Sequence, residues 1–163
     1  MKLSANFELS ELTKSQVAER KGLPNNPSAN QIDNLKALCV NVLQPIRSEF
    51  DKPVIISSGY RSGEVCVAIG SKPTSQHAEG KAVDFEIVGI DNKDLFDWIK
   101  NHLEFDQLIL EFYKDGEANS GWIHVSWNGG DNRNQTLKAV REETGKVVYK
   151  PLWHTLTISK MLN

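Results

Sequence analysis

Two short apolar segments near the middle of the chain constrain its fold most. Residues 107–112 and 122–127 are rich in aliphatic and aromatic side chains, and the intervening residues 113–121 are polar and contain glycine. Segments of this kind predict β-strands, and a short polar loop between them is typical of antiparallel neighbours. We therefore expect the two segments to pair as adjacent antiparallel strands.

Helical and further strand patterns surround this pair. A short helical run is expected between residues 10 and 20, and apolar residues recur at helical spacing over 32–46, where Pro45 predicts a kink. A second amphipathic helix should follow Asp91. Two more strands are expected at 54–56 and 82–88, and a last hairpin turn at 144–146. The patterns predict a single α+β domain over 1–163, with a small antiparallel β-sheet flanked by helices, a motif core at about 53–128, and a tail (139–163) without an assigned role.

Composition and charge exclude several classes of partner. The chain has 163 residues, 39% of them hydrophobic, which is enough for one domain to bury its own core. A formal net charge of -2 gives no reason to expect nucleic acid or an anionic membrane as a partner. No run of about 20 apolar residues occurs, and the first residues lack the apolar core of a secretion signal. We expect a soluble monomer that is made in the cytoplasm, with no membrane insertion.

The densest group of chemically active residues lies at 75–84, Ser-Gln-His-Ala-Glu-Gly-Lys-Ala-Val-Asp. It places His77 in a loop and Asp84 at the head of a strand, and both are ligand types for zinc. A catalytic zinc takes three protein ligands, so a third is needed. His124, in the middle of a strand, is the natural candidate, because His102 ends a helix and His154 lies in the tail. Gly80 would let the loop fold back. The spacing by itself leaves ordinary core or surface roles open.

Three ordered motifs resemble those of the zinc D-alanyl-D-alanine carboxypeptidases (peptidase M15-like), a family that includes phage cell-wall endopeptidases. They are residues 57–62 (Ser-Ser-Gly-Tyr-Arg-Ser), 75–84 and 122–126 (Trp-Ile-His-Val-Ser), and the similarity extends from about 7 to 127. The resemblance implies a Hedgehog/D-Ala-D-Ala peptidase-like fold, one catalytic Zn²⁺ on His77, Asp84 and His124, and cleavage of an amide bond near D-alanine in the peptidoglycan stem peptide. Such an enzyme would reach the cell wall after export or lysis, which fits a phage or prophage lysis enzyme.

The same resemblance implies a role for Arg61 in binding substrate or steadying the scissile carbonyl. A guanidinium grips a carboxylate with two hydrogen bonds or stabilises a developing oxyanion, so the chemistry agrees. Ser75 and Gln76 precede the first ligand and are candidates for substrate binding or for orienting the metal-bound imidazole. As polar loop residues they could equally cap a turn.

The general base is where this chain departs from the family. Relatives carry a glutamate three residues before the last ligand or a histidine two residues before it. Here those positions are Gly121 and Trp122, and neither side chain can transfer a proton.

Glu111 is the candidate that we expect to replace this base. It ends the strand 107–112, next to the His124 strand, and strand alternation places it on one face with Gln107 and Ile109. Its carboxylate can then reach the metal site from the neighbouring strand. Asp106 is a reserve candidate and Asp115, in the loop, a weaker one.

Three functional hypotheses remain open from the sequence. The first is a zinc peptidase, either a carboxypeptidase or an endopeptidase. The second is a catalytically inactive zinc-containing binding or structural module of the same fold, suggested by Gly121 and Trp122. The third is a cysteine hydrolase that uses Cys66 or Cys39 with a histidine, although apolar neighbours favour buried free thiols at both positions.

Overall fold

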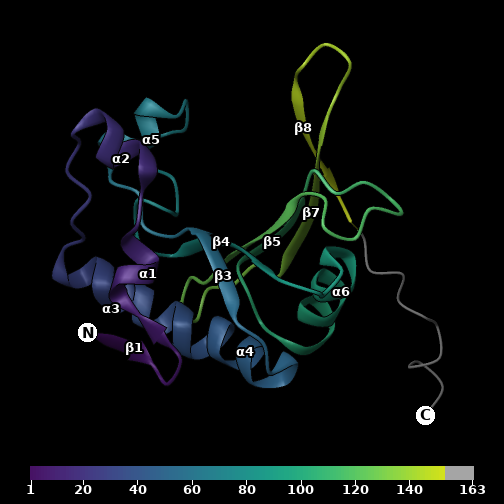
Figure 1. Ribbon diagram of the computed structural model, residues 1–163, viewed down its shortest axis with the longest axis horizontal. Coiled ribbons are helices and arrows are strands. Elements are labelled where there is room, and N and C mark those ends of the chain that lie inside the picture. The colour runs from purple at the N-terminus through teal and green to yellow at the C-terminus, as the bar shows by residue number, and fades with distance from the viewer. Residues whose placement is uncertain (153–163) are drawn as a thin grey trace.

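A computed structural model describes residues 1–152 of the chain (Figure 1). A six-stranded sheet has the order β3-β4-β6-β5-β7-β8. Its strands are β3 (Val54–Ser58), β4 (Ala82–Ile87), β5 (Gln107–Glu111), β6 (Trp122–Ser126), β7 (Gln135–Arg141) and β8 (Val147–Pro151). The helices are α1 (Leu9–Thr13), α2 (Gln16–Lys21), α3 (Ala29–Leu38), the π-helix η1 (Cys39–Leu43), α4 (Gln44–Phe50), α5 (Gly63–Ala68) and α6 (Asn92–His102), and β1 (Lys2–Ser4) pairs with β2 (Phe7–Glu8).

The expected pair of central strands is confirmed. β5 and β6 are antiparallel neighbours, with Ile109 opposite His124 and Glu111 opposite Trp122. β4 pairs antiparallel with the other edge of β6, and β3 lies beyond β4. The far side of the sheet was not anticipated, because β7 pairs parallel with β5 and carries β8 as an antiparallel hairpin partner. The α+β fold is therefore confirmed, with a sheet that is larger than expected and mixed.

The long helical pattern at 32–46 forms a helix with a π-turn in its middle. Ser28 caps α3 through a reciprocal pair of hydrogen bonds with Gln31. The backbone N–H of Gln44 then donates to the carbonyl of Cys39, five residues back, just before Pro45. Proline has no N–H to donate and crowds the carbonyl four residues before it, so the wider turn accommodates the ring. At the position where the sequence predicted a kink, the structure therefore has a π-turn directly before Pro45.

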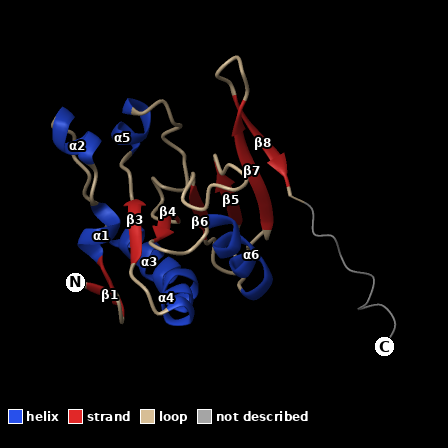
Figure 2. Ribbon diagram, turned by 45° about the vertical axis from the view of Figure 1, so that its right-hand side comes forward, coloured by secondary structure: helices blue, strands red, loops and turns tan. Residues whose placement is uncertain are grey.

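Helices α3, α4 and α6 cover one face of the sheet and leave the other face for a site (Figure 2). Side chains such as Phe85, Leu108 and Val125 point toward α3, α4 and α6 and belong to the main hydrophobic core. By strand alternation, Asp84, His124 and Glu111 lie on the opposite face. The fold thus positions polar side chains from three neighbouring strands side by side on the uncovered face.

Smaller expectations have definite outcomes. The helical run at 10–20 is divided into α1 and α2, and the Ser15 side chain caps α2. The last hairpin turns at 142–146, so the first part of the tail forms β7 and β8, whereas residues 153–163 lie outside the described residues. Cys39 and Cys66 are both buried free thiols, as expected. Within residues 1–152, no helix has the length and apolar character to cross a membrane.

Candidate metal and active site

The first motif residue, His77, is held in place by the loop around it. Gly80 has a φ of 73°, and a Cβ there would come within 2.5 Å of the Gln31 carbonyl oxygen, so only glycine lets the loop return to β4. The His77 ring is buried, and its Nδ1 lies 2.8 Å from the carbonyl oxygen of Gly59. A carbonyl oxygen can only accept a hydrogen bond, so Nδ1 carries the proton of the neutral ring. Nε2 is then unprotonated and has a lone pair that can coordinate a metal.

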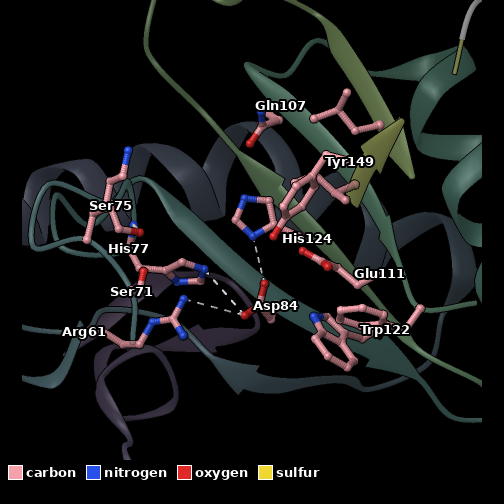
Figure 3. Close-up of a pocket in the computed structure, with 14 residues that line it drawn as sticks. Arg61, Ser71, Ser75, His77, Asp84, Gln107, Glu111, Trp122, His124 and Tyr149 are labelled. Atoms are coloured by element: carbon pink, nitrogen blue, oxygen red, sulfur yellow. Dashed lines mark hydrogen bonds and ion pairs between the residues drawn. The ribbon is translucent and has the colours of Figure 1, made fainter. Parts of the chain in front are cut away.

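Asp84 and His124 complete a cluster with His77 (Figure 3). The two residues are direct partners across β4 and β6, with His124 Nδ1 2.9 Å from Asp84 Oδ1. His77 Nε2 lies 3.5 Å from Asp84 Oδ2, and the candidate ligand atoms of all three residues lie within 4.8 Å of one another. Two ligands at about 2.1 Å from a tetrahedral zinc are about 3.4 Å apart, so this spacing suits the ion.

The protonation states of the cluster also suit a metal. Burial lowers the pKa of His77, which keeps its imidazole neutral and able to coordinate. Burial by itself would raise the pKa of Asp84, but the hydrogen bond that its carboxylate accepts from His124 Nδ1, together with the nearby His77 ring, lowers it below its ordinary value. Two imidazoles and one carboxylate are a donor set of catalytic zinc sites. The residues present therefore fit the metal that the family implies.

The cluster opens into a cleft of about 720 Å³ on the uncovered face of the sheet. Arg61 lines this cleft, with Nη2 4.0 Å from Asp84 Oδ2, and its Nε is buried without a hydrogen-bond partner among residues 1–152. The backbone N–H of Arg61 donates to the His77 carbonyl, which ties two of the sequence motifs together. Ser75 also lines the cleft, and its hydroxyl accepts from the backbone N–H of His77.

Glu111 lies in the same cleft, and its carboxylate points toward His124 and Asp84 (Figure 3). Its side chain is 7% exposed, and burial raises the pKa of its carboxyl to about 7. Its Oε2 atom has no hydrogen-bond partner in the described part of the chain. A buried carboxyl with one free oxygen and a pKa near neutrality has the properties of a group that exchanges protons.

The glycine at the family's usual base position has a structural reason. Gly121 has a φ of 64°, and a Cβ there would overlap the backbone carbonyl of Glu111. No residue with a side chain fits at this point without displacing the end of β5. The next residue, Trp122, lines the cleft opposite Glu111 and packs against Phe112 at a ring-centroid distance of 5.4 Å.

The other candidate residues lie elsewhere. The Gln76 side chain donates to Asp106 at 2.8 Å, and it does not line the cleft, so its role in substrate binding stays a prediction. Asp106 is 1% exposed and accepts hydrogen bonds from the Arg133 guanidinium and backbone, which lower its pKa. Asp115 is exposed in the loop before β6. Neither aspartate lines the cleft, whereas Glu111 does.

The geometry does not favour a cysteine hydrolase. Burial raises the pKa of Cys66, and raises that of Cys39 to about 12, so both thiols stay protonated at neutral pH. Neither thiol lines the cleft. The His102 ring stacks on Trp98, and His154 lies outside the described residues.

Two cleft residues come from the C-terminal hairpin, whose turn was predicted at 144–146 but whose place beside the site was not. Leu137 on β7 and Tyr149 on β8 line the cleft opposite the motif loops. Burial, with the negative charges of Glu111 and Asp84, raises the pKa of Tyr149. The predicted hairpin implies two strands here, but only the pairing of β7 with β5 places them at the site.

Taken together, the cluster and the cleft provide the donor set and the open space that a metallopeptidase requires. The family model for peptidase M15 matches residues 5–126, about three quarters of the chain. The chain belongs to this family and is a peptidase of the metal-dependent type. A search of curated proteins found no match.

Proposed function

We propose that the chain is a zinc-dependent peptidase that cleaves peptide bonds next to D-alanine in peptidoglycan. The observation that supports this most is Glu111, a buried carboxyl with a pKa of about 7 in the same cleft as the cluster of His77, Asp84 and His124. The preference for D-alanine rests on the motifs that resemble D-alanyl-D-alanine peptidases. We further propose that the enzyme acts as a monomer on the cell wall after export or lysis, in the manner of a phage lysis enzyme.

In this proposal His77, Asp84 and His124 would hold the ion. A zinc ion bound there would polarise a carbonyl oxygen and would lower the pKa of a coordinated water to about 7. The Gly59 carbonyl keeps the proton of His77 on Nδ1, so that Nε2 faces the other two ligands. This backbone contact fixes the ring orientation before any metal enters.

Glu111 would move the proton. With a pKa of about 7, a large share of the carboxyl is ionised near neutral pH, so it can take a proton from the attacking water and pass it to the leaving amine. Arg61, which lines the cleft beside Asp84, would hold the substrate carbonyl or a terminal carboxylate. Ser75, at the mouth of the cleft, supplies a hydroxyl for the peptide backbone.

A catalytically inactive zinc module of the same fold is the second candidate. Its support was the absence of an acid-base side chain at Gly121 and Trp122. Glu111 removes much of that support, because it reaches the same cleft from the neighbouring strand. The peptidase is therefore the better supported of the two.

Hydrolysis of defined substrates tests the proposal. Zinc-loaded protein should release D-alanine or new amine ends from stem peptides ending in D-alanyl-D-alanine or from intact peptidoglycan. Glu111→Gln should keep its zinc and lose about 100-fold or more in kcat. Glu104→Gln, an exposed carboxylate ahead of β5, is the matched control and should keep full activity. If zinc-loaded wild type hydrolyses neither peptides nor wall, the inactive module is the correct reading.

A further inference from the structure

We propose that the β7–β8 hairpin adds a substrate-binding subsite to the catalytic cleft, in which Tyr149 contacts the peptide chain beyond the scissile bond. The inference rests on the proposed function, because it concerns the same cleft. It assigns a role to a hairpin at 135–151 that lies wholly after the residues matched by the family model, 5–126.

Strand register places Tyr149 in line with the proposed base. Glu111 on β5 is the partner of Ala139 on β7, and Ala139 is in turn the partner of Tyr149 on β8. The residue between them is therefore alanine, whose small side chain is fully buried and does not project between Tyr149 and Glu111. Tyr149 lines the same cleft as His124 and Glu111, and Figure 3 shows its ring directed toward these two side chains. The small side chain is what allows a tyrosine two strands away to reach the cleft.

The floor of this part of the cleft is apolar. Ile109 and Leu137 line the cleft and, with the buried Ala139, form a second hydrophobic cluster that is separate from the main core. Tyr149 is 53% exposed above this floor. An exposed aromatic ring next to an apolar floor provides a large contact area for a peptide at little cost in side-chain entropy, and its hydroxyl can donate to a peptide carbonyl.

The subsite lies to one side of the metal cluster. Three strand steps separate β6, which carries His124, from β8, which carries Tyr149. At about 4.8 Å for each step the two strand backbones are about 14 Å apart, and the Tyr149 side chain reaches back across part of this distance toward His124. A peptide that ends close to the cleaved bond would not extend along β7 and β8. A substrate that continues along the sheet would contact these strands, so the subsite favours longer stem peptides on this side of the bond.

A series of stem peptides, lengthened one residue at a time on either side of the D-alanine bond, tests the inference. In zinc-loaded wild type, kcat/KM should rise about tenfold as the chain is lengthened on one side, which is the effect of one well-packed aromatic contact. Tyr149→Ala should lose this rise, mainly through KM, and Tyr149→Phe should lose the part due to the hydroxyl. Lys150→Ala, on the same strand with its side chain on the other face, is the matched control and should behave as wild type.

The outcomes separate this inference from the proposed function. If Tyr149→Ala keeps the wild-type dependence on length while its zinc content and Tm are unchanged, the subsite is wrong and the peptidase stands. If wild type hydrolyses no peptide, the proposed function fails. The subsite is then tested by calorimetry, which compares the affinity of the zinc-loaded wild type and variants for the longest peptide. Binding that Tyr149→Ala weakens about tenfold, but Lys150→Ala does not, supports it. Equal binding by these proteins, or no binding to wild type, overturns it.

Discussion

Replacing Glu111 with glutamine should stabilise the metal-free protein at alkaline pH, although it removes the proposed base. The wild-type carboxyl is buried, which raises its pKa from 4.5 to about 7. A carboxyl with a raised folded-state pKa contributes stability that is fully present below the unfolded pKa and is lost as pH rises through the folded one. The loss should therefore develop between about pH 4.5 and 7, and glutamine, which stays neutral, should avoid it.

The size of the effect follows from the same pKa. A rise from 4.5 to about 7 corresponds to about 3 kcal/mol in the free energy of unfolding. Glu111→Gln and wild type should be about equally stable near pH 4.5, and the variant should be more stable by about 3 kcal/mol at pH 8. For a chain of this size that difference raises Tm by about 6–12 °C.

Urea unfolding of both proteins in a chelator, from pH 5 to 8, measures the difference directly. Glu104→Gln, which changes an exposed carboxylate, should show no such trend. Added zinc should narrow the gap at pH 8, because a nearby cation favours the ionised carboxylate of the wild type. A stability difference that does not change with pH, or a variant less stable than wild type at pH 8, would refute the reasoning about Glu111.

The remaining predictions concern the metal and the supports of the site. Zinc at 100 times its Kd should stabilise the wild type by about 2.7 kcal/mol in thermal unfolding, and His124→Ala should abolish the gain. Asp106→Ala should cost about 3 kcal/mol in urea unfolding, because it leaves the Arg133 and Gln76 donors without their buried acceptor. Gly121→Ala should lower Tm, with a cost above about 1 kcal/mol, and reduce kcat, because its Cβ overlaps the Glu111 backbone. A wild type that zinc does not stabilise, or an Asp106→Ala or Gly121→Ala variant as stable as the wild type, would contradict the contacts described at that position.

Much of the site follows from local sequence patterns. Alternation along 107–112 places Glu111 with Ile109 on the uncovered face, and the antiparallel pairing of that strand with the next brings it beside His124. A loop containing Gly80 returns His77 to the strand that carries Asp84. These are short-range features, fixed by strand periodicity and by a backbone conformation that favours glycine.

The parts that were missed depend on contacts between distant segments. The pattern of 135–141 predicts no partner, so the parallel pairing of β7 with β5 could not be inferred from it. Tyr149 enters the cleft only through two successive strand pairings, with Ala139 between. The Asp106 network joins three loop residues that are far apart in the sequence, and this network occupies Gln76. Periodicity indicates which face a side chain takes, but the order of strands in the sheet decides what lies beside it.

The central claim is that His77, Asp84 and His124 hold one zinc ion that hydrolysis requires. The most direct test measures zinc content and hydrolysis of a stem peptide on the same samples, before chelation, after chelation and after zinc is restored. The account predicts one zinc for each wild-type chain, activity that falls and returns with the metal, and no tightly bound zinc in His77→Ala or His124→Ala. Hydrolysis that persists in the fully metal-free protein, or full zinc retention in both histidine variants, would contradict it.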